Sequence, residues 1–159
     1  MTTHDNVMAL REAVEAFNDP QRRERFLDLY DPAVVAHGYP DGASDLQGVR
    51  RFYETVWRVF PDARIEIDEV IAEDERVAVR YCMAGGQVAS FFGAPPTEGR
   101  PRRPAMAVLH FSGGRVVEEW QTAGTLSTLT RLAAEAARPR HSAAAEAAAL
   151  RWEEREGAV

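Results

Sequence analysis

Histidine is the side chain whose charge changes near neutral pH, so the histidines are the first candidates for proton transfer. His110 interrupts the apolar run over residues 107–111, where an imidazole could both give and accept protons. His37 precedes Gly38 at the end of a short apolar run and could line the mouth of a site. Both rings also fit a structural role in which they only satisfy hydrogen bonds. Both interpretations stay open on sequence alone.

Residues 116–123 alternate like a β-strand and carry two adjacent carboxylates. If the strand is regular, one face collects the even-numbered positions, which are Glu118, Trp120, Thr122 and Gly124, and Glu119 points away from it. Glu118 would then lie beside an aromatic wall formed by Trp120, where burial with an apolar ligand could raise its pKa and allow acid–base chemistry. A solvated position for Glu118 at the sheet edge, and a core position for Trp120, are the alternatives.

Gln87 is a candidate hydrogen-bond donor to a carbonyl or a developing oxyanion. An amide can donate in this way, although it cannot act as a general base. Tyr81 shares a face with Gln87 if the segment between them is regular, unless the glycines at 85 and 86 introduce a bulge. The structural alternatives are that Gln87 satisfies backbone groups at this bend and that Tyr81 fills the core.

Composition argues against several classes of protein. The chain has 159 residues, with 25 acidic and 19 basic side chains and a net charge of -6, which disfavours nucleic acid as a partner. Cys82 is the single cysteine, and no lysine is present to form a Schiff base. No phosphate-binding loop, dinucleotide fingerprint or metal-ligand spacing occurs, so we expect no cofactor and no metal. With no apolar run of about 20 residues and no signal-peptide features, we expect a cytoplasmic protein without a membrane partner.

Hydrophobic periodicity predicts helices first and strands afterwards. Apolar residues at helical spacing, with N-caps at Asp19 and Asp45, predict helices over 4–17, 20–30 and 45–60. Alternating patterns predict strands over 34–36, 64–68, 77–81, 105–111 and 116–123, with a proline-rich loop over 93–104. A further helix is expected over 125–137. This order is typical of an α+β domain in which helices cover one face of an antiparallel sheet.

The C-terminal segment differs in composition from the rest of the chain. Residues 133–149 contain ten alanines, interrupted by Pro139. Ser142 could cap a helix there, but its apolar face is thin, which favours a solvated or frayed helix over a partner-binding element. We expect one domain over residues 1–138 and an alanine-rich tail, helical or disordered, over 139–159.

Three stretches of sequence carry a resemblance to a known family. They read FPDARIEIDEVIAEDERVAVR, GGQVASFFGAPPTEGR and GGRVVEEW, and with their flanks they resemble the SnoaL-like polyketide cyclases over about residues 7–132. That family belongs to the nuclear transport factor 2-like superfamily. The resemblance implies a cone-shaped barrel in which a curved antiparallel sheet wraps around N-terminal helices. It also implies a small-molecule pocket, no cofactor and a homodimer. Members close rings by aldol condensation, and others of similar fold isomerise, hydroxylate or open epoxides.

Two positions depart from the family pattern. Members usually carry an acid–base aspartate four residues after the tryptophan, and Gly124 occupies that position here. Gln87 replaces the histidine of the usual GTH triplet. We therefore expect His110 to have taken over proton transfer, with Gln87 as a hydrogen-bond donor. Glu118 and His37 complete the expected catalytic set.

The sequence thus leads to one main functional hypothesis. We expect a cyclase or isomerase that needs no cofactor and acts on a small hydrophobic, polyketide-derived intermediate. Epoxide opening or another ring closure governed by positioning is one alternative, and a binding protein without catalysis is the other. The residues expected to contact the substrate are Tyr39, Tyr53, Trp57, Tyr81, Phe91, Phe92, Met106, Trp120, Thr122 and Gly124.

Overall fold

The structure is a computed structural model, and it describes residues 1–96 and 98–122. The helical elements are α1 (Thr3–Phe17), the 3-10 helix η1 (Arg23–Leu29) and α2 (Leu46–Val59). The strands are β1 (Tyr30–His37), β2 (Arg64–Glu73), β3 (Arg76–Ala84), β4 (Arg102–Ser112) and β5 (Arg115–Gln121). No helix in this described part is long and apolar enough to cross a membrane. The helix expected over 125–137 and the tail over 139–159 lie outside the described residues.

Side-chain caps fix where the two α-helices begin. Thr2 accepts a hydrogen bond from the Asp5 amide at 3.2 Å, and Asp5 accepts one from the Thr2 amide at 2.7 Å. This reciprocal pair is a capping box that starts α1. Asp45 accepts a hydrogen bond from the Gly48 amide at 2.8 Å and caps α2, as the sequence predicted.

The helix predicted over 20–30 was wrong in type and in length. Asp19 accepts a hydrogen bond from the Gln21 amide at 2.9 Å, so the chain forms a turn at this point. The tighter helix η1 follows it, and Tyr30 already belongs to β1. The outcome matters for the site, because Tyr30 becomes a strand residue that faces the interior with an exposed fraction of only 2%.

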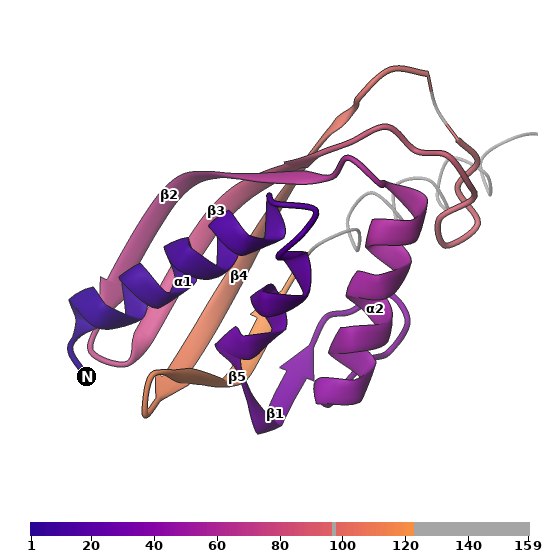
Figure 1. The fold of residues 1–159 in the computed structure, drawn as a ribbon. Coiled ribbons are helices and arrows are strands. Elements are labelled where there is room, and N and C mark those ends of the chain that lie inside the picture. Colours follow the sequence, from indigo (N-terminus) through magenta and orange to yellow (C-terminus); the bar gives the residue numbers. More distant parts are fainter. Residues whose placement is uncertain (97, 123–159) are drawn as a thin grey trace, which may run out of the picture. The chain divides into compact units, whose positions relative to one another are not determined.

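The five strands form one curved sheet in the order β1-β5-β4-β3-β2 (Figure 1). Pairing is antiparallel from β2 through β5, as predicted. β1, however, pairs with β5 in parallel, so the sheet is mixed rather than purely antiparallel. A parallel pair requires a long connection instead of a hairpin. Here α2 and the strands β2 to β4 form that connection between β1 and β5. His110 and Trp120 lie on the neighbouring strands β4 and β5, as expected.

The helices all cover one face of the sheet, which we call the inner face (Figure 1). Helix α1 packs against β2 and β3, η1 against β5, and α2 against β1. The core between these layers contains fully buried side chains such as Phe17, Phe60 and Phe111. The opposite, outer face carries exposed side chains. This arrangement confirms the α+β cone architecture and creates an interior that the next section describes.

Candidate active site

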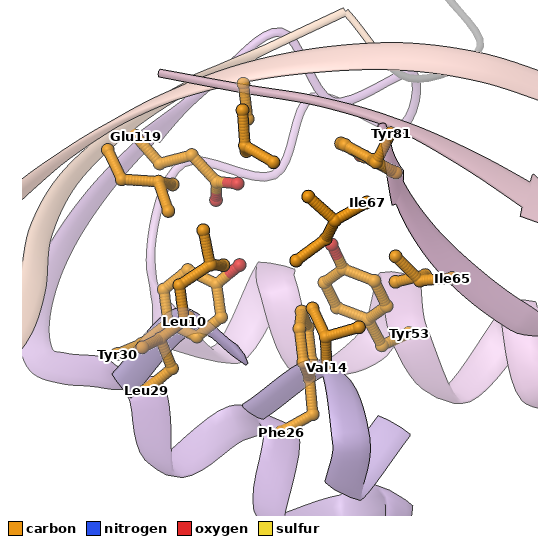
Figure 2. A pocket seen from close by; sticks show the side chains of 13 residues that line it. Leu10, Val14, Phe26, Leu29, Tyr30, Tyr53, Ile65, Ile67, Tyr81 and Glu119 are labelled. Carbon is orange, nitrogen blue, oxygen red and sulfur yellow. The ribbon is translucent and has the colours of Figure 1, made fainter. Parts of the chain in front are cut away.

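An internal cavity lies between the inner face of the sheet and the helices (Figure 2). It contains about 400 Å³ of space outside the atoms, a figure that includes open solvent. Its wall is mostly apolar. The polar groups come from Tyr30, Tyr53 and Tyr81 and from one carboxylate, Glu119. Within residues 1–96 and 98–122, no cluster of histidine, cysteine, aspartate or glutamate side chains could hold a metal ion.

Glu119 is the central polar group of this cavity. It projects from β5 with an exposed fraction of 3%, and its carboxylate points towards the tyrosines (Figure 2). The hydroxyl of Tyr39 donates a hydrogen bond to Glu119 Oε2 at 2.8 Å. Burial raises the pKa of Glu119 to about 7, although hydrogen bonding by Tyr39 and Tyr30 offsets part of that shift. A carboxyl group with such a pKa can both accept and return a proton near neutral pH.

The tyrosines around Glu119 remain protonated hydrogen-bond donors. Burial raises the pKa values of Tyr30, Tyr39 and Tyr53 well above the ordinary value, and nearby Glu119 adds to this effect. Burial also raises the pKa of Tyr81. Figure 2 shows the hydroxyl groups of Tyr30 and Tyr53 directed towards the space beside the Glu119 carboxylate. These hydroxyls could therefore stabilise negative charge that develops on a bound molecule.

A second cavity adjoins the first, since Tyr53, Ile65 and Tyr81 line both. It contains about 500 Å³ of space outside the atoms, again partly open to solvent. Its wall is also largely apolar, and its charged side chain is Arg103. Burial lowers the pKa of the Arg103 guanidinium, which nevertheless stays charged because arginine starts from such a high value.

The histidines predicted to be catalytic do not line either cavity. His110 lies on the outer face of β4, with its Nε2 3.5 Å from Oε2 of Glu75. His37 lies on the outer face of β1, where its Nε2 is 3.1 Å from Oε1 of Glu118. The His37 ring stacks on Trp120, with ring centroids 5.1 Å apart. The structure therefore brings His37, Glu118 and Trp120 together, but on the side of the sheet away from the cavities.

A bulge in β5 explains why Glu119, and not Glu118, faces inward. Val116 and Glu118 each pair with a residue of β4, and Val117 between them is the extra residue. Alternation counted from the buried Val116 would turn Glu118 inward, whereas the bulge shifts the alternation by one position. The prediction that Glu119 points away from Trp120 is confirmed, but the expectation that the Trp120 face lines the site was wrong.

The side-chain amide of Gln87 donates its hydrogen bonds within its own loop. Its Nε2 donates to the carbonyl oxygens of Ala89 and Ala94, both at 2.9 Å, so neither amide proton is left for a ligand. Its Oε1 accepts a hydrogen bond from Arg103 Nη2 at 3.1 Å. The structure thus favours the alternative in which Gln87 organises the loop, and it adds a link to Arg103.

The residues expected to contact the substrate divide into three groups. Those that line a cavity are Tyr53, Tyr81 and Phe91. Tyr39 lines neither cavity, but its hydroxyl donates a hydrogen bond to Glu119. Trp57 packs against Phe17, and Phe92 against Phe52, in the aromatic core. Met106, Trp120 and Thr122 are exposed and line neither cavity. Gly124 lies outside the described residues.

Sequence reasoning missed Glu119, Tyr30 and Arg103. The available signal for Glu119 was the pair of adjacent carboxylates in an apolar strand, since one of any two neighbours must face the interior. Tyr30 was missed because the sequence predicted it to end a helix over 20–30, whereas it begins β1. Arg103 was assigned to the proline-rich loop, although β4 already begins at Arg102.

Comparisons with known proteins agree with this architecture. The sequence matches the SnoaL-like polyketide cyclase family over residues 8–132. AclR from Streptomyces galilaeus, a proposed hydroxylase, is 25% identical with a TM-score of 0.69, and the match covers 82% of this chain and 97% of AclR. IdmH from Streptomyces antibioticus, a proposed polyketide cyclase, is 24% identical with a TM-score of 0.62 over 82% of this chain and 98% of IdmH. No curated protein matches the sequence. The family match extends over most of the chain and includes every residue that lines the first cavity. The chain therefore belongs to the SnoaL-like polyketide cyclase family.

Proposed function

We propose that the protein is a cyclase or isomerase that needs no cofactor and uses Glu119 as its general acid–base. The observation that carries this proposal is a single, fully buried carboxyl group, with a pKa of about 7, in an otherwise apolar cavity. The apolar wall suits a hydrophobic, polyketide-derived substrate, in keeping with the family. Glu119 would then supply the proton transfer that the family aspartate supplies at the position of Gly124.

The proposed reaction begins with proton abstraction next to a substrate carbonyl. The ionised Glu119 carboxylate takes the α-proton, and the resulting enolate oxygen is stabilised by a tyrosine hydroxyl from Tyr30 or Tyr53. In a cyclisation, the enolate carbon attacks a second carbonyl of the same molecule, a carbon–carbon bond forms, and Glu119 returns its proton to the new alkoxide. In an isomerisation, Glu119 returns the proton to a different carbon. Either route leaves Glu119 ionised for the next turnover.

The initial proton abstraction can be tested without the natural substrate. We expect the protein to accelerate exchange of the α-protons of 2-tetralone, a small apolar ketone, in deuterated buffer, as followed by NMR. Glu119→Gln should lower this rate by about 100- to 10,000-fold, the usual contribution of a positioned base. Glu118→Gln is the matched control, because it removes the neighbouring carboxylate from the outer face. Equal exchange by wild type and Glu119→Gln would refute the assignment, and tight binding without exchange would favour a binding protein.

We also propose that two copies of the chain associate through the outer face of the sheet. An exposed apolar row crosses it from strand to strand, because Ile71 pairs with Ala78, Ala78 with Val108, and Val108 with Trp120. Ile71, Val108 and Trp120 have exposed fractions of 65%, 39% and 39%. A contiguous exposed apolar patch on a charged protein is typical of an interaction site. The same surface on both partners would form a closed, two-fold dimer.

A further inference from the structure

Arg103 differs from the other arginines at its end of the sheet. Arg102 Nη1 lies 2.7 Å from Oε2 of Glu66, and Arg100 forms an ion pair with Asp62. Arg103 has no carboxylate within ion-pair distance in the part of the chain that the structure describes. Arg103 is half-buried, and its guanidinium lines a mostly apolar cavity without a carboxylate of the described residues to neutralise it.

The groups around Arg103 are neutral and hold it in a fixed orientation. Its Nη2 donates to Oε1 of Gln87 at 3.1 Å, and its Nη1 makes a long contact of 3.4 Å to the carbonyl oxygen of Pro101. The guanidinium carbon lies 4.5 Å from the centre of the Phe60 ring, in a cation–π contact. A guanidinium has five N–H groups, so these two contacts leave three donors for a ligand.

Arg103 and Glu119 lie in the walls of two adjoining cavities. Arg103 is on the inner face of β4 in the same row as Ala105 and Leu109, and Leu109 pairs across the sheet with Glu119. Six residues separate Arg103 from Leu109, which corresponds to about 20 Å along the strand. The two cavities share the wall residues Tyr53, Ile65 and Tyr81, so an elongated ligand that opened them further could reach both groups.

We propose that the substrate carries a free carboxylate, which binds Arg103 while the reacting carbon lies beside Glu119. This inference rests on the proposed function of Glu119 for the position of the reacting end. A planar carboxylate matches the forked donors of a guanidinium, and its single negative charge neutralises the single positive charge of the cavity. A phosphate dianion would leave an uncompensated charge in an apolar surrounding. The substrate class is therefore a hydrophobic keto acid rather than a neutral ester.

Gln87 acts in this arrangement as a positioning residue. Both of its amide protons are held by the loop carbonyls of Ala89 and Ala94, so its Oε1 is fixed against Arg103. Replacing the amide with a carboxylate would place a negative charge at the same atom. Gln87→Glu should therefore neutralise Arg103 internally and remove its attraction for a ligand.

The test compares anthraquinone-2-carboxylate with its methyl ester, two probes that differ chiefly in charge. Dissociation constants are measured by calorimetry at pH 6, where Glu119 is mostly protonated. We expect the wild-type protein to bind the acid about 10- to 100-fold more tightly than the ester, as a charged hydrogen-bonded pair implies. Arg103→Met and Gln87→Glu should each abolish this preference. Arg102→Met is the matched control, because that side chain points outward, and it should keep the preference.

Three results would overturn the inference: equal affinities for acid and ester in the wild type, a preference that survives in Arg103→Met, or no binding of the acid. Thermal unfolding of each variant shows whether it is folded, and Arg103→Gln, which also removes the charge, provides the answer if Arg103→Met is not. Glu119→Gln separates this inference from the proposed function. If it keeps both the acid preference and full 2-tetralone exchange, the role of Glu119 fails and the Arg103 site stands. If exchange is lost in Glu119→Gln but the wild type shows no acid preference, the Arg103 site fails and the role of Glu119 stands.

Discussion

Glu118 and Glu119 are consecutive residues of β5 that occupy opposite environments. On the outer face, Glu118 Oε1 lies 3.1 Å from His37 Nε2. Glu119, by contrast, faces the cavity and has an exposed fraction of 3%. The pair therefore offers a built-in comparison. The same substitution at either position removes one carboxylate from the same strand, but only the substitution at Glu119 should affect chemistry in the cavity.

Glu119 should make the protein less stable as the pH rises. Its folded-state pKa of about 7 exceeds the ordinary value of 4.5, so the folded protein binds the proton more tightly than the unfolded chain. The favourable contribution is complete below pH 4.5, declines between pH 4.5 and 7, and is absent above that range. Its full size is about 3 kcal/mol, because each pKa unit corresponds to about 1.4 kcal/mol.

Urea unfolding at a series of pH values measures this effect. Glu119→Gln should become progressively more stable relative to wild type as the pH is raised from 5 to 8. A constant difference between wild type and Glu119→Gln across that range would contradict the raised pKa.

Tyr39→Phe should move the pH–rate profile to higher pH. The Tyr39 hydroxyl donates to the Glu119 carboxylate at 2.8 Å, and this hydrogen bond lowers the pKa of Glu119. Without it, the ionised base forms at a higher pH, so the rising limb of 2-tetralone exchange shifts in that direction. Tyr81→Phe is the control, because Tyr81 lines the cavity but is not a hydrogen-bond partner of Glu119. An unchanged midpoint in Tyr39→Phe would show that Glu119 is not the titrating base.

His110→Ala distinguishes the sequence-based hypothesis from the structural one. The His110 ring contacts Glu75 on the outer face, and it does not line either cavity. We therefore expect the variant to exchange 2-tetralone protons at a rate close to that of wild type. A loss of about 100-fold or more would instead restore His110 as the general base. The variant's unfolding curve is the check that any loss is not caused by misfolding.

Val108→Glu should convert a dimer to a monomer. Val108 lies in the middle of the exposed apolar row, between Ala78 and Trp120. Two glutamates brought together across a two-fold interface would repel each other and be poorly solvated. Light scattering after size exclusion measures the mass directly, with Ser112→Glu, at the far end of β4, as the control. A wild-type monomer, or a dimer that persists in Val108→Glu, would rule out this interface.

The sequence predicted the elements better than it predicted the site. Local signals such as the Asp45 cap and the alternation of 64–68 were sufficient to locate α2 and β2. The inward face of β5 depended on the bulge at Val117, which is set by pairing with β4 and leaves no mark in the local pattern. Arg103 was missed for a related reason, since the proline-rich composition hid the start of a strand that neighbouring β3 stabilises.

The parallel pairing of β1 with β5 has a consequence for the order in which the proposed site is assembled. Tyr39 and Glu119, which share a hydrogen bond, are 80 residues apart in sequence, and the strands that precede and carry them meet only in this pairing. During synthesis, the emerging chain can form α1, α2 and the β2–β3 hairpin before the acid has left the ribosome. Contacts between such distant segments form slowly, because closing the long intervening loop is entropically unfavourable. Glu119, the proposed acid–base, therefore joins Tyr39 only in the final strand of the sheet, and the proposed activity would appear only once the whole sheet has formed.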